Sequence, residues 1–522
     1  MAGQAEEMGS EVTGLGVATA KGGVSYVSAS LVRSLFIFLL LVILVRLLQP
    51  AYYGFYTIAI SFYAIIEIIG YFGIGTALRK RLPESETDVQ KAHVVNGAYL
   101  ITSLMGVILA VIAFLLSNYI AVTYYNNTAL TLLLEIASIT VISDTLYNVG
   151  VSTLLGLGKN GHAAISNVSY AAVNLVVSPA LVLLGFGVAG ALIGNLVAFT
   201  FAMFLSLFYI IRAIGFRFHM PSKPMMKYLM QFSLPVFVSN AANIGATNFG
   251  VLFLGIFASA AMVGNYGAAF KLGSFVTVIL SATTFVLLPA FSHAFSKENL
   301  SKRIGDIFNG SLYYSVLMLL PMVAYAVSVS TPLTALLFSS AYHSSGLYFA
   351  AIASGLVLGV IGLYSGTLMI GHGSVKRFML YQLLVVAIEL VSMAILVPRF
   401  NATGLLFAFY LIGPIASNII YTKFLFDRFS FKIEIWPILR VLCASVVIAV
   451  LLYIMSVLLH QSKVLILLNG IVLVLLYPPL LALFGGAKRK NIEFVRKVGD
   501  RMHLIKPLVD RFCSYSEFFI KS

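Results

Sequence analysis

The chain has 522 residues, of which 60% are hydrophobic and 10% are charged, and its net charge is +15. Soluble domains carry about 25% charged residues, so this composition excludes an ordinary soluble protein and indicates a membrane protein. The positive charge is spread over short loops and one tail, which favours anionic lipid headgroups over nucleic acid as a partner. Cys443 and Cys513 are its two cysteines, and we expect no disulfide.

Apolar runs of about 20 residues predict membrane-spanning helices, because that length crosses a hydrocarbon core of ~30 Å. Residues 1–23 are acidic and rich in glycine, and they predict a disordered cytoplasmic tail. A first lobe of six spans is expected over residues 24–212, followed by a cytoplasmic linker at 213–227. Its expected spans are about 25–48, 55–77, 93–116, 130–157, 162–184 and 188–211.

The second half repeats this scheme over residues 228–427. Its expected spans are about 228–255, 264–289, 307–331, 346–369, 378–397 and 402–426. Two further spans over 437–484 have no counterpart in the first half, and a basic cytoplasmic tail covers 485–522. This tail is interpreted either as a basic amphipathic helix on the inner leaflet or as a solvated segment.

The Lys and Arg residues indicate the orientation of the chain in the membrane. When the loops between successive spans are assigned to alternate sides of the membrane, 28 of the 33 bases fall on one side. Only Arg399 and Lys463 fall on the other side. The remaining three, Arg33, Arg46 and Lys271, lie inside apolar runs. Because short loops that retain bases are cytoplasmic, both termini are predicted to be inside. Of the Asn-x-Ser/Thr sequons, those at Asn126 and Asn401 then face outside and that at Asn299 faces inside.

Matching residues at near-constant spacing indicate an internal repeat. Gly54 and Gly264 open the second and eighth spans, 210 positions apart. At the inner turns, Gly158 is paired with Gly371 and Gly161 with Gly373, and at the outer turns Gly187-Val-Ala-Gly matches Asn401-Ala-Thr-Gly. Six spans per repeat is an even number, so both halves insert the same way up, with a pseudo-two-fold axis along the membrane normal.

These residues resemble those of the polysaccharide-biosynthesis flippases, within the multidrug/oligosaccharidyl-lipid/polysaccharide exporter superfamily. The motifs that carry the resemblance are Val45-Arg-Leu-Leu-Gln-Pro-Ala-Tyr-Tyr-Gly54, Phe232-Ser-Leu-Pro235, Val263-Gly-Asn-Tyr-Gly-Ala-Ala269 with Leu288-Pro289, and Ile370-Gly-His-Gly373. In the first motif, Gln49 stands where the family usually has glycine. The resemblance covers about residues 25–485 and implies two six-helix lobes that face a central cavity. We therefore expect an all-α integral membrane protein with about 14 transmembrane helices.

The bases inside the spans raise the question of a binding site. Arg33 and Lys271 lie roughly 12 Å and 10 Å into their spans at 1.5 Å per residue. A cation at the centre of the bilayer costs about 2.5–3.5 kcal/mol, so such a residue either faces an aqueous cavity and a phosphate, snorkels to the interface, or pairs with an acid. Arg46 lies near the outer interface, where snorkelling or a structural role in the turn is favoured.

Polar residues inside the spans are the other candidates. Asp144 and Glu67 are candidates for coupling to H⁺ or Na⁺, and each is equally well explained as a counter-ion or a structural acid. On the seventh span, a polar run after Pro235 includes Asn240 and Asn243, which line a substrate cavity or bond neighbouring helices.

The expected function is that of a flippase, a monomer in the plasma membrane that moves a polyprenyl-(pyro)phosphate-linked saccharide from the cytoplasmic to the outer leaflet by alternating access. Arg33, Lys271, Asn240 and Asn243 would bind the substrate. A multidrug/cation antiporter of the same superfamily and a membrane glycosyltransferase or polymerase are the alternatives. The sequence has no phosphate-binding Gly-x-x-x-x-Gly-Lys-Ser/Thr loop and no clustered metal ligands, so we expect no enzyme, no cofactor and no metal site.

Overall fold

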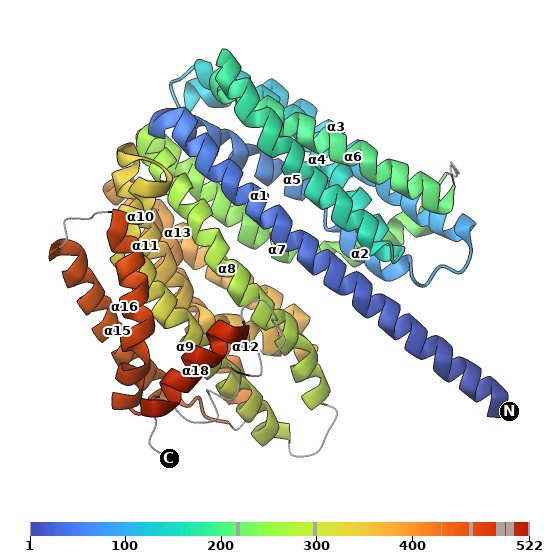
Figure 1. The fold of residues 1–522 in the computed structure, drawn as a ribbon. Coiled ribbons are helices and arrows are strands. Elements are labelled where there is room, and N and C mark those ends of the chain that lie inside the picture. The colour runs from blue at the N-terminus through green and yellow to red at the C-terminus, as the bar shows by residue number, and fades with distance from the viewer. Residues whose placement is uncertain are drawn as a thin grey trace. The chain divides into compact units, whose positions relative to one another are not determined.

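The computed structural model describes residues 2–215, 220–295, 300–429, 431–458, 463–486, 496 and 506–519. Within these ranges, the side chains at the following positions lie outside the description: 2–25, 27, 278–279, 281–283, 285–286, 288–289, 293, 300–301, 463–465, 467, 508 and 512. Every secondary-structure element in these residues is a helix, which confirms the all-α class (Figure 1). The chain forms two compact units, Met1–Gly267 and Ala268–Ser522, which divide within one helix, α8 (Ala260–Ala294).

The first unit is built from α1 to α7 and the beginning of α8. Its helices are α1 (Ala2–Tyr71), α2 (Ile74–Arg81), α3 (Asp88–Thr123), α4 (Ala129–Gly156), α5 (Asn160–Leu181), η1 (Val182–Phe186), α6 (Gly187–Ile214) and α7 (Lys223–Phe257). Helix α4 packs against α1, α3 and α6, α5 packs against α1 and α6, and α7 packs against α1, α2 and α3. Helix α1 begins at Ala2, within the segment expected to be disordered, and the assignment of 1–23 as a tail stays a prediction.

The second unit contains the rest of α8 and the helices that follow it. They are α9 (Leu300–Ser328), α10 (Ser330–Leu337), η2 (Ser340–Tyr342), α11 (His343–Leu358), α12 (Val360–Gly371), α13 (Val375–Phe407), η3 (Ala408–Ile412), α14 (Gly413–Arg428), α15 (Ile435–Leu458), α16 (Lys463–Leu483) and α18 (Lys506–Phe519). Helix α15 packs against α9 and α16, and α18 contacts α16. Most of the predicted basic tail, including Lys488-Arg489-Lys490, lies outside the described residues, as does Asn299.

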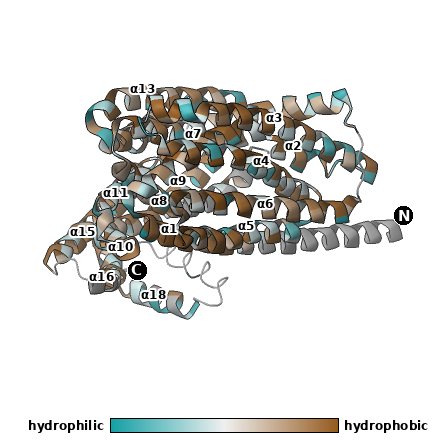
Figure 2. Ribbon diagram, turned by 90° about the horizontal axis from the view of Figure 1, so that it is seen from above, coloured by the Kyte–Doolittle hydropathy of each residue, from teal (hydrophilic) through white to brown (hydrophobic). Residues whose placement is uncertain are grey.

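Within the described residues, eight helical segments are long and apolar enough to cross a membrane, or up to nine with the bent pair α11–α12. Figure 2 shows apolar residues along the length of these helices. The chain is therefore a multi-pass membrane protein.

Three of these segments are too long for one crossing of the membrane. In each of them the helix is interrupted at one or two residues with positive φ. Helix α1 would be roughly 105 Å long if straight, at 1.5 Å per residue, but it is two helices that meet at Gln49, with φ 56° and ψ 165°. The run from α5 to α6 breaks at Gly185 and Gly187, and α13 breaks at Asn401. The breaks fall where the sequence predicts turns between successive spans, while the count of fourteen stays a prediction.

Two pairs of turns in the proposed repeat have the same backbone. Gly187 and Asn401, 214 positions apart, have φ/ψ of 53°/−133° and 51°/−129°. At the inner turns, Lys159 N donates to Leu154 O over 2.8 Å, and 215 positions later Ser374 N donates to Met369 O over 2.9 Å. Each of these helix ends has a left-handed glycine, Gly158 with φ 71° or Gly373 with φ 81°. The structural partner of Gly158 is thus Gly373 rather than Gly371.

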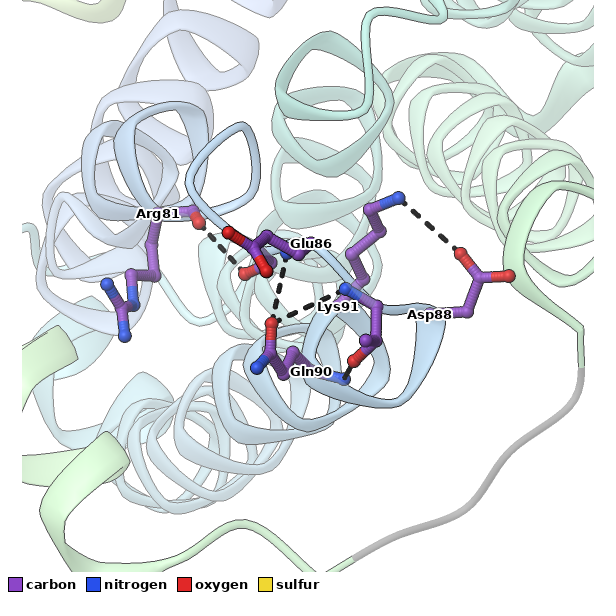
Figure 3. A network of polar contacts seen from close by, with 7 residues as sticks. Arg81, Glu86, Asp88, Gln90 and Lys91 are labelled. Carbon is purple, nitrogen blue, oxygen red and sulfur yellow. Dashed lines mark hydrogen bonds and ion pairs between the residues drawn. The ribbon is translucent and has the colours of Figure 1, made fainter.

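The turn between α2 and α3 is fixed by a capping box. Gln90 Oε1 accepts from the backbone N of the N-cap residue Thr87 at 3.4 Å, while Gln90 N donates to the Thr87 hydroxyl at 3.3 Å. Lys91 Nζ lies 3.4 Å from Asp88 Oδ1, and Ser85 Oγ donates to Arg81 O (Figure 3). The basic loop predicted here is therefore an ordered turn between helices.

Candidate functional site

Arg33 lies on α1 inside the first unit and is half-buried. Its Cζ is 5.9 Å from the centroid of the Tyr170 ring on α5, within the range of a cation–π contact. Its Nε is buried and has no hydrogen-bond partner. None of the ion pairs between described residues includes Arg33. The guanidinium thus lies against an aromatic face, and its buried Nε–H has no hydrogen-bond partner.

Two acids of the first unit share one amide donor. Asn148 Nδ2 on α4 lies 2.8 Å from Asp144 Oδ1, one turn earlier, and 3.1 Å from Glu67 Oε1 on α1. Asp144 is buried, and it experiences the negative charge of Glu67 and the positive charge of Arg33. Two carboxylates so close together in a membrane span repel each other when both are ionised.

A network of aromatic and amide side chains surrounds these charges. The Tyr147 hydroxyl on α4 donates to Asn167 Oδ1 on α5, and Asn167 Nδ2 donates to the Tyr26 hydroxyl on α1 at 3.1 Å. Further along α5, the Tyr170 hydroxyl donates to Asn195 Oδ1 on α6 at 3.1 Å. Side-chain hydrogen bonds therefore join four helices, α1, α4, α5 and α6, around the residues that contact Arg33.

Asn240 and Asn243 project from α7 and are exposed in the first unit. Helix α7 packs against this unit through other residues, among them Phe237, whose ring stacks on Phe72 with centroids 4.6 Å apart. The helix is continuous through Pro235. Polar side chains left exposed on a membrane helix are poorly suited to lipid, which agrees with either predicted role, lining a cavity or bonding a neighbouring helix.

Lys271 and Arg46 are the other two bases inside the predicted spans. Lys271 is exposed on the part of α8 that belongs to the second unit, and its backbone carbonyl accepts from Ser274 Oγ at 2.6 Å. Arg46 is exposed near the break at Gln49. That Arg33 and Lys271 share one cavity stays a prediction, because they belong to different compact units.

Sequence reasoning missed the aromatic and amide network. A signal was available, because Asn167, Tyr170, Asn174 and Ser178 recur every three or four residues along α5 and so occupy one helix face. A polar face inside an apolar span indicates buried partners. Which helices supply those partners depends on packing, which the spacing within α5 does not contain.

Comparisons with known proteins agree with this fold. Residues 43–346 match a family model described as polysaccharide biosynthesis protein. A structure of the lipid II flippase MurJ, inward closed, has a TM-score of 0.67 and 14% identity, with 88% of this chain and 98% of that chain covered. An inward-facing multidrug resistance MATE family transporter of the MOP superfamily has a TM-score of 0.61 and 16% identity, with coverage of 77% and 96%.

A third structure, a MOP superfamily transporter from Pyrococcus furiosus, has a TM-score of 0.52 and 17% identity, with coverage of 78% and 94%. A search of curated proteins found no match. At these identities the likenesses establish the fold that this chain shares with those transporters, while the family model covers more than half of the sequence. The resemblance seen in the motifs is confirmed, and the chain belongs to the polysaccharide biosynthesis protein family.

Proposed function

We propose that the protein is a flippase that moves a polyprenyl-(pyro)phosphate-linked saccharide from the cytoplasmic to the outer leaflet of the plasma membrane. The family supports a role in polysaccharide biosynthesis, and the fold is that of transporters that include a lipid II flippase. A lipid-linked saccharide combines a tail that stays in lipid with a charged, hydrated head. The head needs a polar path, which alternating access through a cationic central cavity supplies.

The observation that carries this proposal is the environment of the Arg33 guanidinium. A guanidinium inside a span is costly, about 2.5–3.5 kcal/mol at the bilayer centre, and an acid in direct contact would usually offset that cost. Here Arg33 rests on an aromatic ring and its Nε has no partner. A phosphate would accept two parallel hydrogen bonds from such a fork.

The remaining candidates have supporting roles in this proposal. Lys271 would supply a second positive charge to the phosphate, as a point charge without the planar fork of arginine. Asn240 and Asn243 would exchange hydrogen bonds with sugar hydroxyls, since an amide both donates and accepts. Their exposure on α7 leaves both amides accessible.

Glu67 and Asp144 would couple transport to an ion gradient. The bonds to Asn148 bring the two carboxylates close together, and this proximity favours one bound proton, or a Na⁺ held by the carboxylate oxygens. The charge of Arg33 acts on Asp144, so a phosphate that neutralises Arg33 would change how readily the acids hold their cation. Substrate binding and ion binding would then be linked.

A multidrug/cation antiporter is the second candidate, and the acid pair is the observation that favours it, because carboxylates attract cationic drugs. Flipping in proteoliposomes separates the two functions. The substrate is a fluorescent polyprenyl-pyrophosphate-linked saccharide, and the competing cargo is a cationic dye. We expect flipping of the lipid, its loss in Arg33→Ala and Lys271→Ala, and partial activity in Arg33→Lys.

Arg46→Ala is the matched control, because it removes a base from the same helix near the break and should leave flipping unchanged. Full activity in both alanine variants at Arg33 and Lys271 would remove the cationic mechanism. Export of the dye without flipping of the lipid would establish the antiporter instead.

A further inference from the structure

The ring beneath Arg33 is itself fixed from two sides. Tyr170 is buried on α5, and its ring stacks on Phe199 of α6, with centroids 4.3 Å apart and planes 22° apart. On α1, Arg33 places its guanidinium carbon 5.9 Å from the Tyr170 centroid. The tyrosine ring is therefore stacked on a second aromatic ring and lies within cation–π distance of the guanidinium.

The hydroxyl of Tyr170 is anchored by amides. It donates to Asn195 Oδ1 at 3.1 Å, and Asn174 Nδ2 reaches the same Oδ1 at 3.0 Å and the hydroxyl at 3.4 Å. Ser178 Oγ bonds Asn174 Oδ1 at 2.5 Å and the carbonyl of Ala191 at 3.1 Å. With its face stacked and its hydroxyl held, the ring has little freedom to turn.

A second anchor sets the rotation of α1. Tyr26 lies seven residues before Arg33, so the two project from nearly the same face of the helix. Its hydroxyl accepts from Asn167 Nδ2 at 3.1 Å, and Asn167 is one turn before Tyr170 on α5. The contact between α1 and α5 therefore fixes both the ring and the helix face that carries the guanidinium.

We propose that Tyr170 is a positioning residue for Arg33, which orients the guanidinium fork toward the phosphate of the substrate while Asn174 and Asn195 hold the ring in place. This inference rests on the proposed function, in which Arg33 binds the phosphate. Tyr170 need not touch substrate. Its contribution is that the fork is already aligned before binding, so less side-chain freedom is lost when phosphate arrives.

The test is a double-mutant cycle with a short-chain polyprenyl pyrophosphate as the probe, titrated into purified full-length protein. We expect Tyr170→Leu to weaken binding by about 3- to 30-fold, the range of a buried cation–π contact. In an Arg33→Gln background the same change should have no further effect, because its target is gone. Tyr99→Leu is the matched control, a partly buried tyrosine of the same unit, and it should change binding in neither background.

A purely structural role gives a different pattern. Tyr170→Leu would then weaken binding by the same factor with and without Arg33, and that result would overturn the inference. If Tyr170→Leu does not fold, or if Arg33→Gln binds too weakly to titrate, Tyr170→Phe decides. It keeps the π-face and should retain binding within about 3-fold, whereas loss of binding in a folded Tyr170→Phe would contradict the proposal. Wild-type affinity in Arg33→Gln would instead remove the proposed function itself.

Discussion

Gln49 shows how one residue divides a long helix. Its backbone, with φ 56° and ψ 165°, lies in a region that is almost exclusive to glycine, and such strain costs of order 1–3 kcal/mol. The side chain of Gln49 is exposed, so little packing would be lost on its removal.

We therefore predict that Gln49→Gly stabilises the protein by about 1 kcal/mol, since relief of strain exceeds the extra entropy of glycine in the unfolded chain. The thermal midpoint of the purified protein should rise. Gln49→Ala keeps a Cβ and should give no such rise. A lower midpoint for the glycine variant would show that the break is held by contacts of the glutamine side chain.

His372, at the inner turn after α12, predicts a pH dependence. Burial, and then the charges of Arg428 and Arg377, hold the pKa of its imidazole below the usual range. The unfolded chain thus binds this proton more readily, and stability present above an unfolded pKa of about 6.5 is lost as the pH falls. Its Nδ1 lies 2.9 Å from Ser374 Oγ, and its ring meets Phe295 edge-on.

Between pH 7.5 and pH 5.5, we expect the thermal midpoint of His372→Asn to fall less than that of the wild type, because the variant has no imidazole to protonate. The midpoints are compared in one buffer series at constant salt, since the two arginine charges are screened by ions. Parallel curves for both proteins would assign the acid sensitivity to other groups.

At the scale of elements, the contact between the second half of α1 and the start of α8 joins two equivalent positions of the repeat. A Cβ added at Gly54 would lie 1.8 Å from Ala260 O, and one at Gly264 would lie 1.9 Å from Pro50 O. The two backbones therefore touch in a reciprocal way, as expected for a contact on a two-fold axis. Both residues belong to the first unit.

Gly54→Ala and Gly264→Ala should each destabilise the protein by 1–3 kcal/mol or more, because backbone rather than a flexible side chain would have to move. Gly245→Ala is the matched control. It lies inside α7 with no atom within 4 Å of the added Cβ, so helix propensity predicts a small gain of about 0.5–1 kcal/mol. Thermal midpoints that fall equally in all three variants would refute the close contact.

The sequence predicted these elements well where the physics is local. The length of the apolar runs located the helices, and Gly187 and Asn401 marked equivalent turns. Both signals are local, because span length and turn type depend on residues that are close in sequence. The sequence paired Gly158 with Gly371 rather than with Gly373 as equivalent positions of the repeat. Only the hydrogen bonds at the helix ends distinguish two glycines that are two residues apart. For the site, it singled out Arg33 as a buried base, but the Tyr170 ring beneath it depends on how α1 and α5 pack.

For the whole molecule, the distribution of bases predicts that both termini and the inner loops are cytoplasmic. Single cysteines introduced after removal of Cys443 and Cys513 test this in sealed vesicles. Met220→Cys should react only with reagent on the cytoplasmic side, and Asn126→Cys only with reagent outside, since both positions are exposed. Labelling of position 220 from outside would contradict the predicted orientation of the chain.

The breaks at Gln49, Gly185–Gly187 and Asn401 also affect where proteases can cleave the protein. Proteases cut extended, accessible chain, whereas each of these turns passes from helix to helix within one to three residues. In contrast, Tyr124–Thr128 joins α3 and α4 through a loop that exposes Asn126. A protease added on the side of these turns should therefore cut the described part of the first unit near Asn126 and leave Gln49 and Gly187 intact.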